Sequence, residues 1–389
     1  MRNIIGTPVL GDDFFGREEE IKYVWSLIEN SNNFIFPSPR RVGKTSFAFK
    51  LLDKAKENGW NTIDINLEES ATNEIDFLEA FIKKLQGLSF WEKAKAKGNG
   101  LLDFISQLRP SIGIGSMEAK LEWERKRESV YAQVSDLLPH DENTLIFFDE
   151  LTVLLTKILK NGEDGKKNVT NFLHWLRALR QKKGSKIRWI FCSSVGIENF
   201  AHLHGISDAI NDVPDFFLKS YNKEKSKEML VRLGGDNELT LSGEIQDAVV
   251  IKLEYCLPYF LQIIFEKIKY LKEIEQQLLN EKIVETAYTA LIEEKHFNTW
   301  VERINEQYND NSSFAFALLK QLCQEKRGMK RESLLNIIAV VGVAPEKTDE
   351  ITSLLLYMLK NDGYIMEEEG KYRFRSPLLR DFWFNRHVK

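Results

Sequence analysis

The chain has 389 residues, of which 43% are hydrophobic and 29% charged, and its formal net charge is −4. At roughly 150 residues per domain, this length predicts two or three domains, each large enough to bury a core. The nearly balanced charge excludes overall basicity as an argument for nucleic-acid binding and leaves a local basic patch open. The longest apolar stretch, residues 334–344, falls short of the ~20 residues that span a bilayer, and the N-terminus lacks the apolar core of a secretory signal. Three scattered cysteines predict neither a disulfide framework nor a zinc site, so we expect a soluble, cytoplasmic protein without a membrane partner.

Strand and helix patterns alternate in the first half of the chain. Four apolar or alternating runs predict strands, at residues 33–36, 61–67, 145–148 and 187–192. Helical spacing fills the intervals, at residues 47–55, 72–138 and 169–182. Within the second interval, residues 110–116 break the helical pattern and, together with residues 119–123, suggest a small inserted hairpin. This alternation predicts an α/β fold with a parallel sheet covered on both faces.

The second half of the chain has a different pattern. Residues 222–300 are almost entirely helical, and two or three further helices precede a pair of short strands at residues 364–366 and 371–375. A tight strand pair after helices is typical of a winged helix. We therefore expect a core at 1–220 with an insertion at about 72–138, a helical lid at 221–300 and a winged-helix domain at 301–389.

A phosphate-binding loop is predicted directly after the first strand. The segment from Ser38 to Thr45 matches G-x-x-x-x-G-K-[ST] except that Ser38 replaces the first glycine. In such a loop, backbone N–H groups and the positive end of the following helix surround a phosphate, the lysine bridges the β- and γ-phosphates, and the Thr45 hydroxyl binds Mg²⁺. A chance match in a basic loop is the competing interpretation, but the required strand and helix flank the motif. The residues expected to hold the nucleotide here are Ser38, Arg40, Arg41, Val42, Gly43, Lys44, Thr45 and Ser46, with Lys44 also acting in catalysis.

Two adjacent carboxylates end the third predicted strand. Asp149 is expected to hold Mg²⁺ through water, and Glu150 to polarise the attacking water as general base. A buried strand followed by an acidic turn is the alternative. The position of the pair after a phosphate loop favours the catalytic interpretation. The second carboxylate favours hydrolysis over mere binding, since a lone aspartate would suggest a switch or a kinase.

Polar residues at and before the next strand end are further candidates. Ser194, or its neighbour Ser193, could hydrogen-bond the γ-phosphate or the attacking water, although serines at strand ends also serve as turn formers. Arg180, or Arg177 one turn earlier, could reach a γ-phosphate of its own or a neighbouring subunit, against the alternative of a solvated helix face. We include Ser194 and Arg180 among the catalytic candidates. The segment LSGEIQ at 241–246 resembles a transporter signature but follows the acidic pair, so we interpret it as a helix start.

Taken together, these motifs resemble the P-loop ATPases of the AAA+/STAND lineage, in particular the archaeal and bacterial ATP-binding protein group. The resemblance runs over about residues 12–386 and rests on FFGREEE at 14–20, PRRVGKTS at 39–46, FFDE at 147–150, LPYFLQ at 257–262 and FRSPLLRDFW at 374–383. It implies that Phe15, Gly16 and Arg17 lie against adenine and the phosphates, and that Pro258 contacts the base. Ser38 and Cys256 replace family glycines, which implies slow turnover or loosened nucleotide specificity.

The sequence thus predicts an α/β P-loop NTPase of the ASCE/AAA+ type with a helical lid and a C-terminal winged helix, using ATP and Mg²⁺. The first functional hypothesis is an ATP-hydrolysing switch whose nucleotide state changes its assembly, as a homo-oligomer or with a protein partner, in defence or signalling. The second is a DNA-acting ATPase of the initiator or transposition-helper type, because residues 371–389 carry six basic side chains against one acidic one, interleaved with aromatics. A non-hydrolysing scaffold and a small-molecule kinase are disfavoured, the latter because it leaves the lid and winged helix unexplained.

Overall fold

The computed structural model describes residues 1–37, 41–88, 91, 98–106, 117–193 and 196–389. The chain forms two compact units. The sheet unit comprises Arg17–Pro37 and Phe47–Phe217, and the helical unit comprises Met1–Gly16, Ser38–Ser46 and Leu218–Lys389. Among the described helices, none combines the length and the apolar character that crossing a membrane requires.

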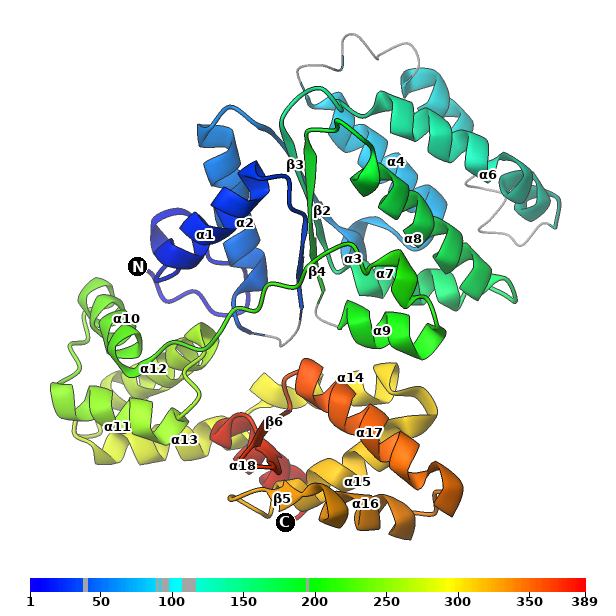
Figure 1. Cartoon of the computed structure of the whole chain (residues 1–389). Coiled ribbons are helices and arrows are strands. Elements are labelled where there is room, and N and C mark those ends of the chain that lie inside the picture. Colours follow the sequence, from blue (N-terminus) through cyan, green and yellow to red (C-terminus); the bar gives the residue numbers. More distant parts are fainter. Residues whose placement is uncertain (38–40, 89–90, 92–97, 107–116, 194–195) are drawn as a thin grey trace. The chain divides into compact units, whose positions relative to one another are not determined.

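A four-stranded parallel sheet forms the centre of the sheet unit (Figure 1). Its strands are β1 (Phe34–Phe36), β2 (Asn61–Asn66), β3 (Thr144–Asp149) and β4 (Ile187–Cys192), in the order β1-β4-β3-β2. All four predicted strands are confirmed. Phe36 pairs in register with Cys192, and Phe148 with Phe191, so the carboxyl ends of β1, β4 and β3 lie at one edge of the sheet.

The free side of β1 carries one more short parallel pairing. The backbone N–H of Ile35 donates to the Pro214 carbonyl at 3.1 Å, and the Phe216 N–H donates to the Ile35 carbonyl at 2.9 Å. The chain near residue 215 therefore covers an edge that would otherwise expose unpaired backbone groups.

Helices cover both faces of the sheet, which explains why β1 and most of β3 are buried without alternation, whereas β2, at the end of the strand order, alternates. Phe147 of β3 meets Phe49 of α2 with ring centroids 5.8 Å apart, while its neighbour Phe148 meets Phe77 of α4 at 5.3 Å. Successive residues of one strand thus enter two different cores. The helices of this unit are α1 (Glu18–Glu29), α2 (Lys44–Glu57, from Phe47 onward), α3 (Leu67–Ser70), α4 (Glu74–Gln86), α6 (Met117–Leu137), α7 (Leu151–Leu159), α8 (Gly165–Gln181), α9 (Ile197–His204) and the 3₁₀ turn η2 (Ser207–Ala209).

The predicted hairpin in the insertion is wrong over its second half. Residues 110–116 lie outside the described residues, but 119–123 belong to helix α6. The reason is a helical face with a spacing of four residues: Trp123, Arg127 and Tyr131 all direct donors to the buried carboxylate of Glu74. The Trp123 indole nitrogen lies 3.4 Å and the Arg127 Nη2 3.2 Å from Glu74 Oε2, and burial raises the pKa of Glu74.

The helical unit contains four helices followed by a smaller mixed α/β segment. The first four are α10 (Lys223–Asp236), α11 (Gly243–Leu253), α12 (Pro258–Glu273) and α13 (Lys282–Glu293). As predicted, LSGEIQ starts a helix: Ser242 caps α11 by accepting the Ile245 N–H at 3.4 Å. The N-terminal chain adds only the 3₁₀ turn η1 (Gly11–Asp13).

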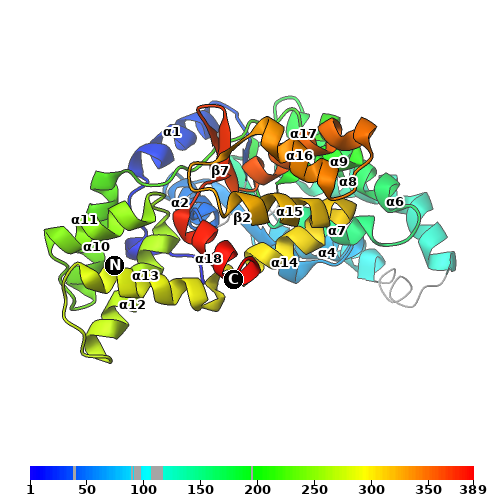
Figure 2. The ribbon, with the colours of Figure 1, turned by 90° about the horizontal axis from the view of Figure 1, so that it is seen from below.

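Apart from its 3₁₀ turns, the C-terminal segment has the order two helices, short strand, two helices, two strands, helix. Its elements are η3 (Lys295–Phe297), α14 (Asn298–Gln307), η4 (Asn309–Asn311), α15 (Ser312–Leu322), β5 (Met329–Lys330), α16 (Arg331–Val340), α17 (Pro345–Asn361), β6 (Ile365–Glu368), β7 (Lys371–Phe374) and α18 (Pro377–His387). The three strands form an antiparallel sheet in the order β5-β7-β6, and α15 packs beside both α14 and α18 (Figure 2). The two predicted strands near the C-terminus are confirmed.

Helix α18 packs against α13, which joins this segment to the preceding four helices. The buried Tyr288 of α13 donates its hydroxyl proton to Asp381 of α18 at 2.9 Å. The predicted boundaries at 220/221 and 300/301 stay predictions, because residues 218–389 fall together in one compact unit.

Candidate functional site

The phosphate-loop segment combines an unusual backbone with a helix start. Ser38 and Arg40 lie outside the described residues, so the described part of the loop begins at Arg41. Arg41 and Gly43 have φ angles of +67° and +91°, and α2 begins at Lys44. A Cβ at Gly43 would meet nothing within 4 Å, so the conformation rather than lack of space requires glycine there. A turn of this kind directs successive N–H groups to one side, next to the positive end of a helix, which suits an anion.

The side chains of this segment have distinct environments. Val42 is fully buried and anchors the turn, Lys44 is buried at the first position of α2, and Thr45 is half-buried. Ser46 is engaged elsewhere: its hydroxyl accepts the backbone N–H of Val9 at 2.8 Å. The Ser46 side chain therefore binds the N-terminal chain, and its expected contact with nucleotide stays a prediction.

Phe15 and Gly16 lie against Tyr221 and the start of α10, all within the helical unit. The Phe15 ring meets Tyr221 edge-on at 6.0 Å, and the Lys225 ammonium lies 5.0 Å from the centre of the Phe15 ring. Gly16 has a φ of +75°, so the backbone favours glycine there, and a Cβ would also displace the flexible end of Lys225, whose Cε would lie 2.9 Å away. Arg17 begins the sheet unit, where its buried guanidinium pairs with Glu20 at 2.9 Å.

The helical unit brings the phosphate-loop segment to the predicted lid motif. Pro258 is the first residue of α12, and the next residue, Tyr259, faces Arg41: the guanidinium carbon lies 4.3 Å from the centre of the Tyr259 ring. Burial raises the pKa of Tyr259, partly opposed by the Arg41 charge. Cys256, at the position where the sequence resemblance predicts glycine, is not among the described residues with a positive φ, so this backbone does not demand glycine.

The acidic pair occupies the carboxyl end of β3 in the sheet unit. Asp149 is the last residue of the strand, and Glu150 follows in a left-handed conformation with φ 58° and ψ 38°. A left-handed conformation costs a residue other than glycine about 1–3 kcal/mol and is found preferentially at functional sites. The turn points the chain from β3 into α7 and leaves the Glu150 side chain at the sheet edge.

Ser193, the first residue after β4, is a described residue that meets Glu150. Its hydroxyl lies 3.5 Å from Glu150 Oε2, in position to donate, and accepts the Thr152 N–H at 3.3 Å. Ser193 is only 4% exposed, so this arrangement is fixed by packing. Ser194, the serine that the sequence favoured, lies outside the described residues. The sequence feature that points to Ser193 is its position directly after an apolar strand.

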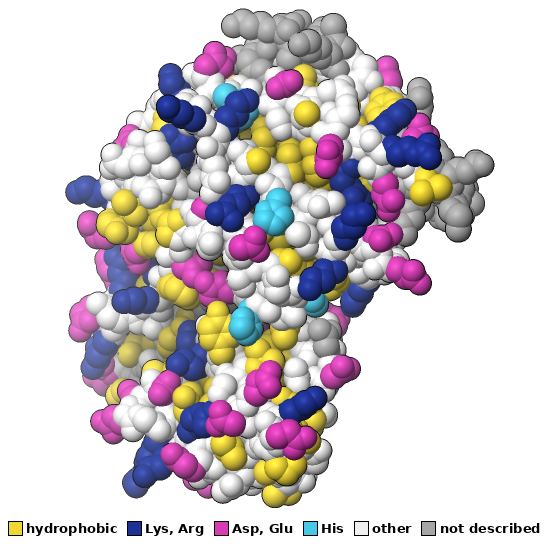
Figure 3. Space-filling model, turned by 45° about the vertical axis from the view of Figure 1, so that its right-hand side comes forward, with side chains coloured by type: hydrophobic (Ala, Val, Ile, Leu, Met, Phe, Trp, Pro, Cys, Tyr) yellow, Lys and Arg dark blue, Asp and Glu magenta, His cyan; other side chains and the backbone are white. Residues whose placement is uncertain are grey.

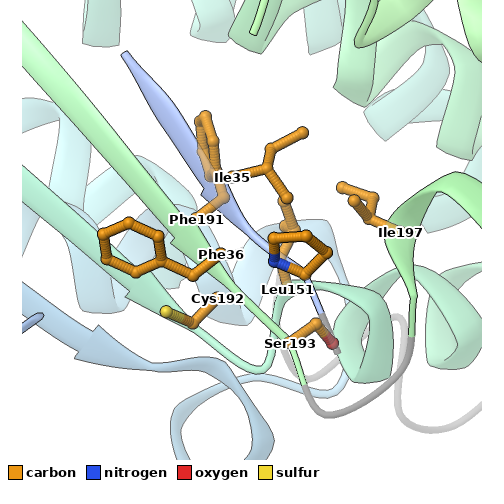
Figure 4. Close-up of a pocket in the computed structure, with 8 residues that line it drawn as sticks. Ile35, Phe36, Leu151, Phe191, Cys192, Ser193 and Ile197 are labelled. Atoms are coloured by element: carbon orange, nitrogen blue, oxygen red, sulfur yellow. The ribbon is translucent and has the colours of Figure 1, made fainter. Parts of the chain in front are cut away.

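A small hollow opens at the same sheet edge (Figure 4). It is lined by Ile35, Phe36, Pro37, Leu151, Phe191, Cys192, Ser193 and Ile197. Adjacent strands supply most of these residues, and the first turns of α7 and α9 supply Leu151 and Ile197. Ser193 therefore contributes a hydroxyl to a lining that is otherwise mostly apolar and that includes Leu151, the residue after Glu150.

Arg180 is held inside the sheet unit. Its guanidinium donates to both carboxylate oxygens of Asp212, at 3.1 and 2.8 Å, and to the Ala209 carbonyl at 2.9 Å. The Arg180 side chain is 2% exposed. This geometry gives Arg180 a structural partner and does not support its predicted catalytic role. Arg177 is more exposed, at 27%, and lies 3.9 Å from Asp212.

We expect Arg180→Ala to lower the free energy of unfolding by about 3–5 kcal/mol, because it removes the bidentate partner of the largely buried Asp212 carboxylate and leaves only the more distant Arg177. Arg177→Ala is the matched control on the same helix face, and we expect it to cost under about 1 kcal/mol. Urea unfolding followed by circular dichroism compares the two variants. A stable Arg180→Ala protein with lost turnover would instead support the catalytic role.

Comparison with solved structures agrees with this architecture. The Walker-type ATPase paby2304 of Pyrococcus abyssi matches with a TM-score of 0.63 and 16% sequence identity, over 98% of this chain and 99% of that one. The ORC2 protein of Aeropyrum pernix, solved in ADPNP–ADP complexes, matches with a TM-score of 0.57 and 12% identity, over 97% and 95% of the two chains. No protein-family model matches the sequence, and no curated protein matches it significantly. The chain therefore has the α/β fold of the P-loop ATPases.

Proposed function

We propose that the protein is a P-loop ATPase of the AAA+ type that binds and hydrolyses ATP with Mg²⁺. The observation that carries the proposal is Glu150, a left-handed residue at the carboxyl end of a central parallel strand with a buried serine hydroxyl on its carboxylate. Ligands of open parallel sheets bind outside the carboxyl ends of the strands, and the GKT segment follows β1 in the sequence.

The residues of the GKT segment and Asp149 have separate roles in the proposed chemistry. Lys44 binds the β- and γ-phosphates, while Thr45 and Asp149 supply the hard oxygen ligands that suit Mg²⁺. Among the described residues, no group of three or more His, Cys, Asp or Glu side chains could hold a metal ion by itself. Mg²⁺ does not need such a group, because it usually keeps several waters and binds through one or two protein ligands plus phosphate. When bound, it would neutralise charge on the phosphates.

Hydrolysis is assigned to Glu150. Its carboxylate would accept a proton from the attacking water, and the Ser193 hydroxyl would restrict the carboxylate to one orientation. Phe15, Gly16 and Pro258 are proposed to contact the base, and Arg17 the phosphates. Ser38, Arg40 and Ser194 remain proposed contacts outside the described residues.

We further propose that hydrolysis drives a switch of the STAND type in signalling or defence. Under this proposal residues 1–220 form the ATPase core, 221–300 the lid and 301–389 a winged helix that faces a protein partner or a second copy. The strand order β5-β7-β6, with α16 and α17 preceding the β6–β7 hairpin, supports the winged-helix assignment.

DNA binding through the winged helix is the second candidate, and the local charges weaken it. Three consecutive glutamates, Glu367–Glu369, lie at the β6–β7 turn just before the basic C-terminal stretch. Arg373 pairs with Glu368 at 2.9 Å, and Lys360 with Glu367 at 2.7 Å. Basic groups that are paired in this way are less available to phosphates.

Helix α17, which follows the helix–turn of the proposed winged helix, is also poorly suited to DNA. Its exposed side chains are mixed in charge and include Glu346, Asp349 and Glu350. Arg331, at the start of α16, is paired with Asp349 at 2.8 Å. On the face drawn in Figure 3, Lys and Arg side chains are likewise interspersed with Asp and Glu. These charges favour a protein partner over DNA.

The solution mass of Glu150→Gln protein tests the proposed switch. We expect the mass to increase with Mg·ATP, but not with Mg·ADP, because the variant should hold the triphosphate state. Analytical ultracentrifugation in the presence and absence of duplex DNA measures this. An increase that requires DNA would favour the second candidate, and an unchanged mass in every condition would contradict self-assembly.

A further inference from the structure

A chain of side-chain contacts within the helical unit joins the phosphate-loop segment to the junction between α13 and α14. The Arg41 guanidinium lies 4.3 Å from the centre of the Tyr259 ring. The Tyr259 hydroxyl lies 3.1 Å from His296 Nδ1, and His296 Nε2 lies 2.8 Å from Glu294 Oε2. Lys267 of α12 also contacts Glu294, through an ion pair.

The directions of these hydrogen bonds follow from the groups involved. The Glu294 carboxylate only accepts, so His296 Nε2 carries a proton; in the neutral ring, Nδ1 then accepts from the Tyr259 hydroxyl. Tyr259 is 8% exposed and sits in the first turn of α12. The Tyr259 ring is therefore held by packing, and its hydroxyl by the histidine.

The contact with the Tyr259 ring leaves the N–H donors of Arg41 available. A guanidinium lying over an aromatic face keeps its N–H groups in its own plane, where they can bind a phosphate in bidentate fashion. Among the described residues, Arg41 has no carboxylate partner. Its long side chain would otherwise sample many rotamers, so a fixed stacking partner reduces the entropy lost when a phosphate binds.

The other end of the chain of contacts lies in a buried aromatic cluster. Phe297, next to His296, is fully buried, with its ring 5.8 Å from Phe260 of α12 and 5.2 Å from Phe382 of α18. A change at His296 therefore acts where α12, η3 and α18 meet.

We propose that Tyr259, held by His296 and Glu294, is a positioning residue that presents the Arg41 guanidinium to a nucleotide phosphate and thereby couples nucleotide binding to the α13–α14 junction. The inference rests on the proposed nucleotide binding. By linkage, a phosphate that binds Arg41 stabilises the Tyr259–His296 contact by the same free energy that this contact adds to phosphate binding.

A double-mutant cycle for ADP affinity, measured by isothermal titration calorimetry, tests the positioning. We expect Arg41→Ala and Tyr259→Leu each to weaken ADP binding about tenfold, and the double variant to be no weaker than either, because both changes remove one arrangement. Additive losses, or an unaffected Tyr259→Leu protein, would overturn the proposal. Failure of the proposed function itself would look different: the wild-type protein would not bind ADP, or would bind it with an affinity that Lys44→Ala does not change.

Hydrogen exchange of the amides at 294–300, with and without ADP, tests the coupling. We expect ADP to slow exchange there in wild type, and His296→Leu to remove the effect while ADP still binds. His296→Asn retains an acceptor near the position of Nδ1 and should restore the response. Tyr288→Phe is the matched control, since it removes a buried tyrosine hydroxyl of the same unit outside this chain of contacts. A response that survives in His296→Leu, or one lost in Tyr288→Phe, would contradict the assignment.

Discussion

Glu150→Gln should lower the turnover of Mg·ATP by about 10²–10⁴-fold, the usual contribution of a general base, while leaving ATP affinity nearly unchanged. The amide retains the size of the side chain and a hydrogen-bond acceptor for Ser193, but it cannot take a proton from water. The measurement is phosphate release at saturating Mg·ATP, combined with the dissociation constant of ATP.

Glu142→Gln is the matched control for this prediction. Glu142 lies just before the opposite end of β3, where its carboxylate accepts from Asn61 at 2.8 Å. The same chemical change there should leave turnover intact. Hydrolysis at the wild-type rate in Glu150→Gln would show that another group activates the water, and would remove the main support for the proposed function.

Lys44→Ala should weaken ATP binding about 10–150-fold, because a hydrogen bond to a charged group contributes about 1.5–3 kcal/mol. Lys44 is buried at the start of α2, directly after the left-handed turn at Arg41 and Gly43. The loss should be larger for ATP than for AMP, which lacks the phosphates that Lys44 would bridge. Calorimetric titration with each nucleotide measures the difference.

Lys50→Ala provides the control on the same helix. Lys50 is less buried than Lys44 and follows it by six residues in α2, so its removal should leave nucleotide affinity unchanged. Equal losses in both variants would point to a general effect of positive charge. Unchanged affinity in Lys44→Ala would exclude the GKT segment as the phosphate site.

The strands and the order of the motifs were predictable because both depend on local pattern. A strand buried on both faces needs a continuous apolar run, as in Phe147 and Phe148, whose rings enter opposite cores. The glycine at position 43 and the acidic pair at 149–150 can likewise be read directly from the order of neighbouring residues. The left-handed conformations of Arg41 and Glu150 cannot, because neither residue type signals a positive φ.

The errors and gaps come from contacts between residues distant in sequence. The hairpin expected at 119–123 gave way to helix α6 because Glu74, about fifty residues earlier, binds one face of that helix. The sequence presented Arg180 as an arginine that could reach a γ-phosphate, but the fold pairs its guanidinium with Asp212. In the basic C-terminal stretch, the fold likewise pairs Arg373 with Glu368 of the preceding strand.

The sequence by itself determined the α/β class, the four parallel strands and the candidates for phosphate and water chemistry, since apolar periodicity and motif spacing are properties of neighbouring residues. Only the tertiary structure decided which polar side chains meet. It paired Ser193 with Glu150, Arg180 with Asp212, and Arg41 with Tyr259. The physical reason is that a charged or polar group takes its role from its partner and its burial, and packing between distant segments sets both.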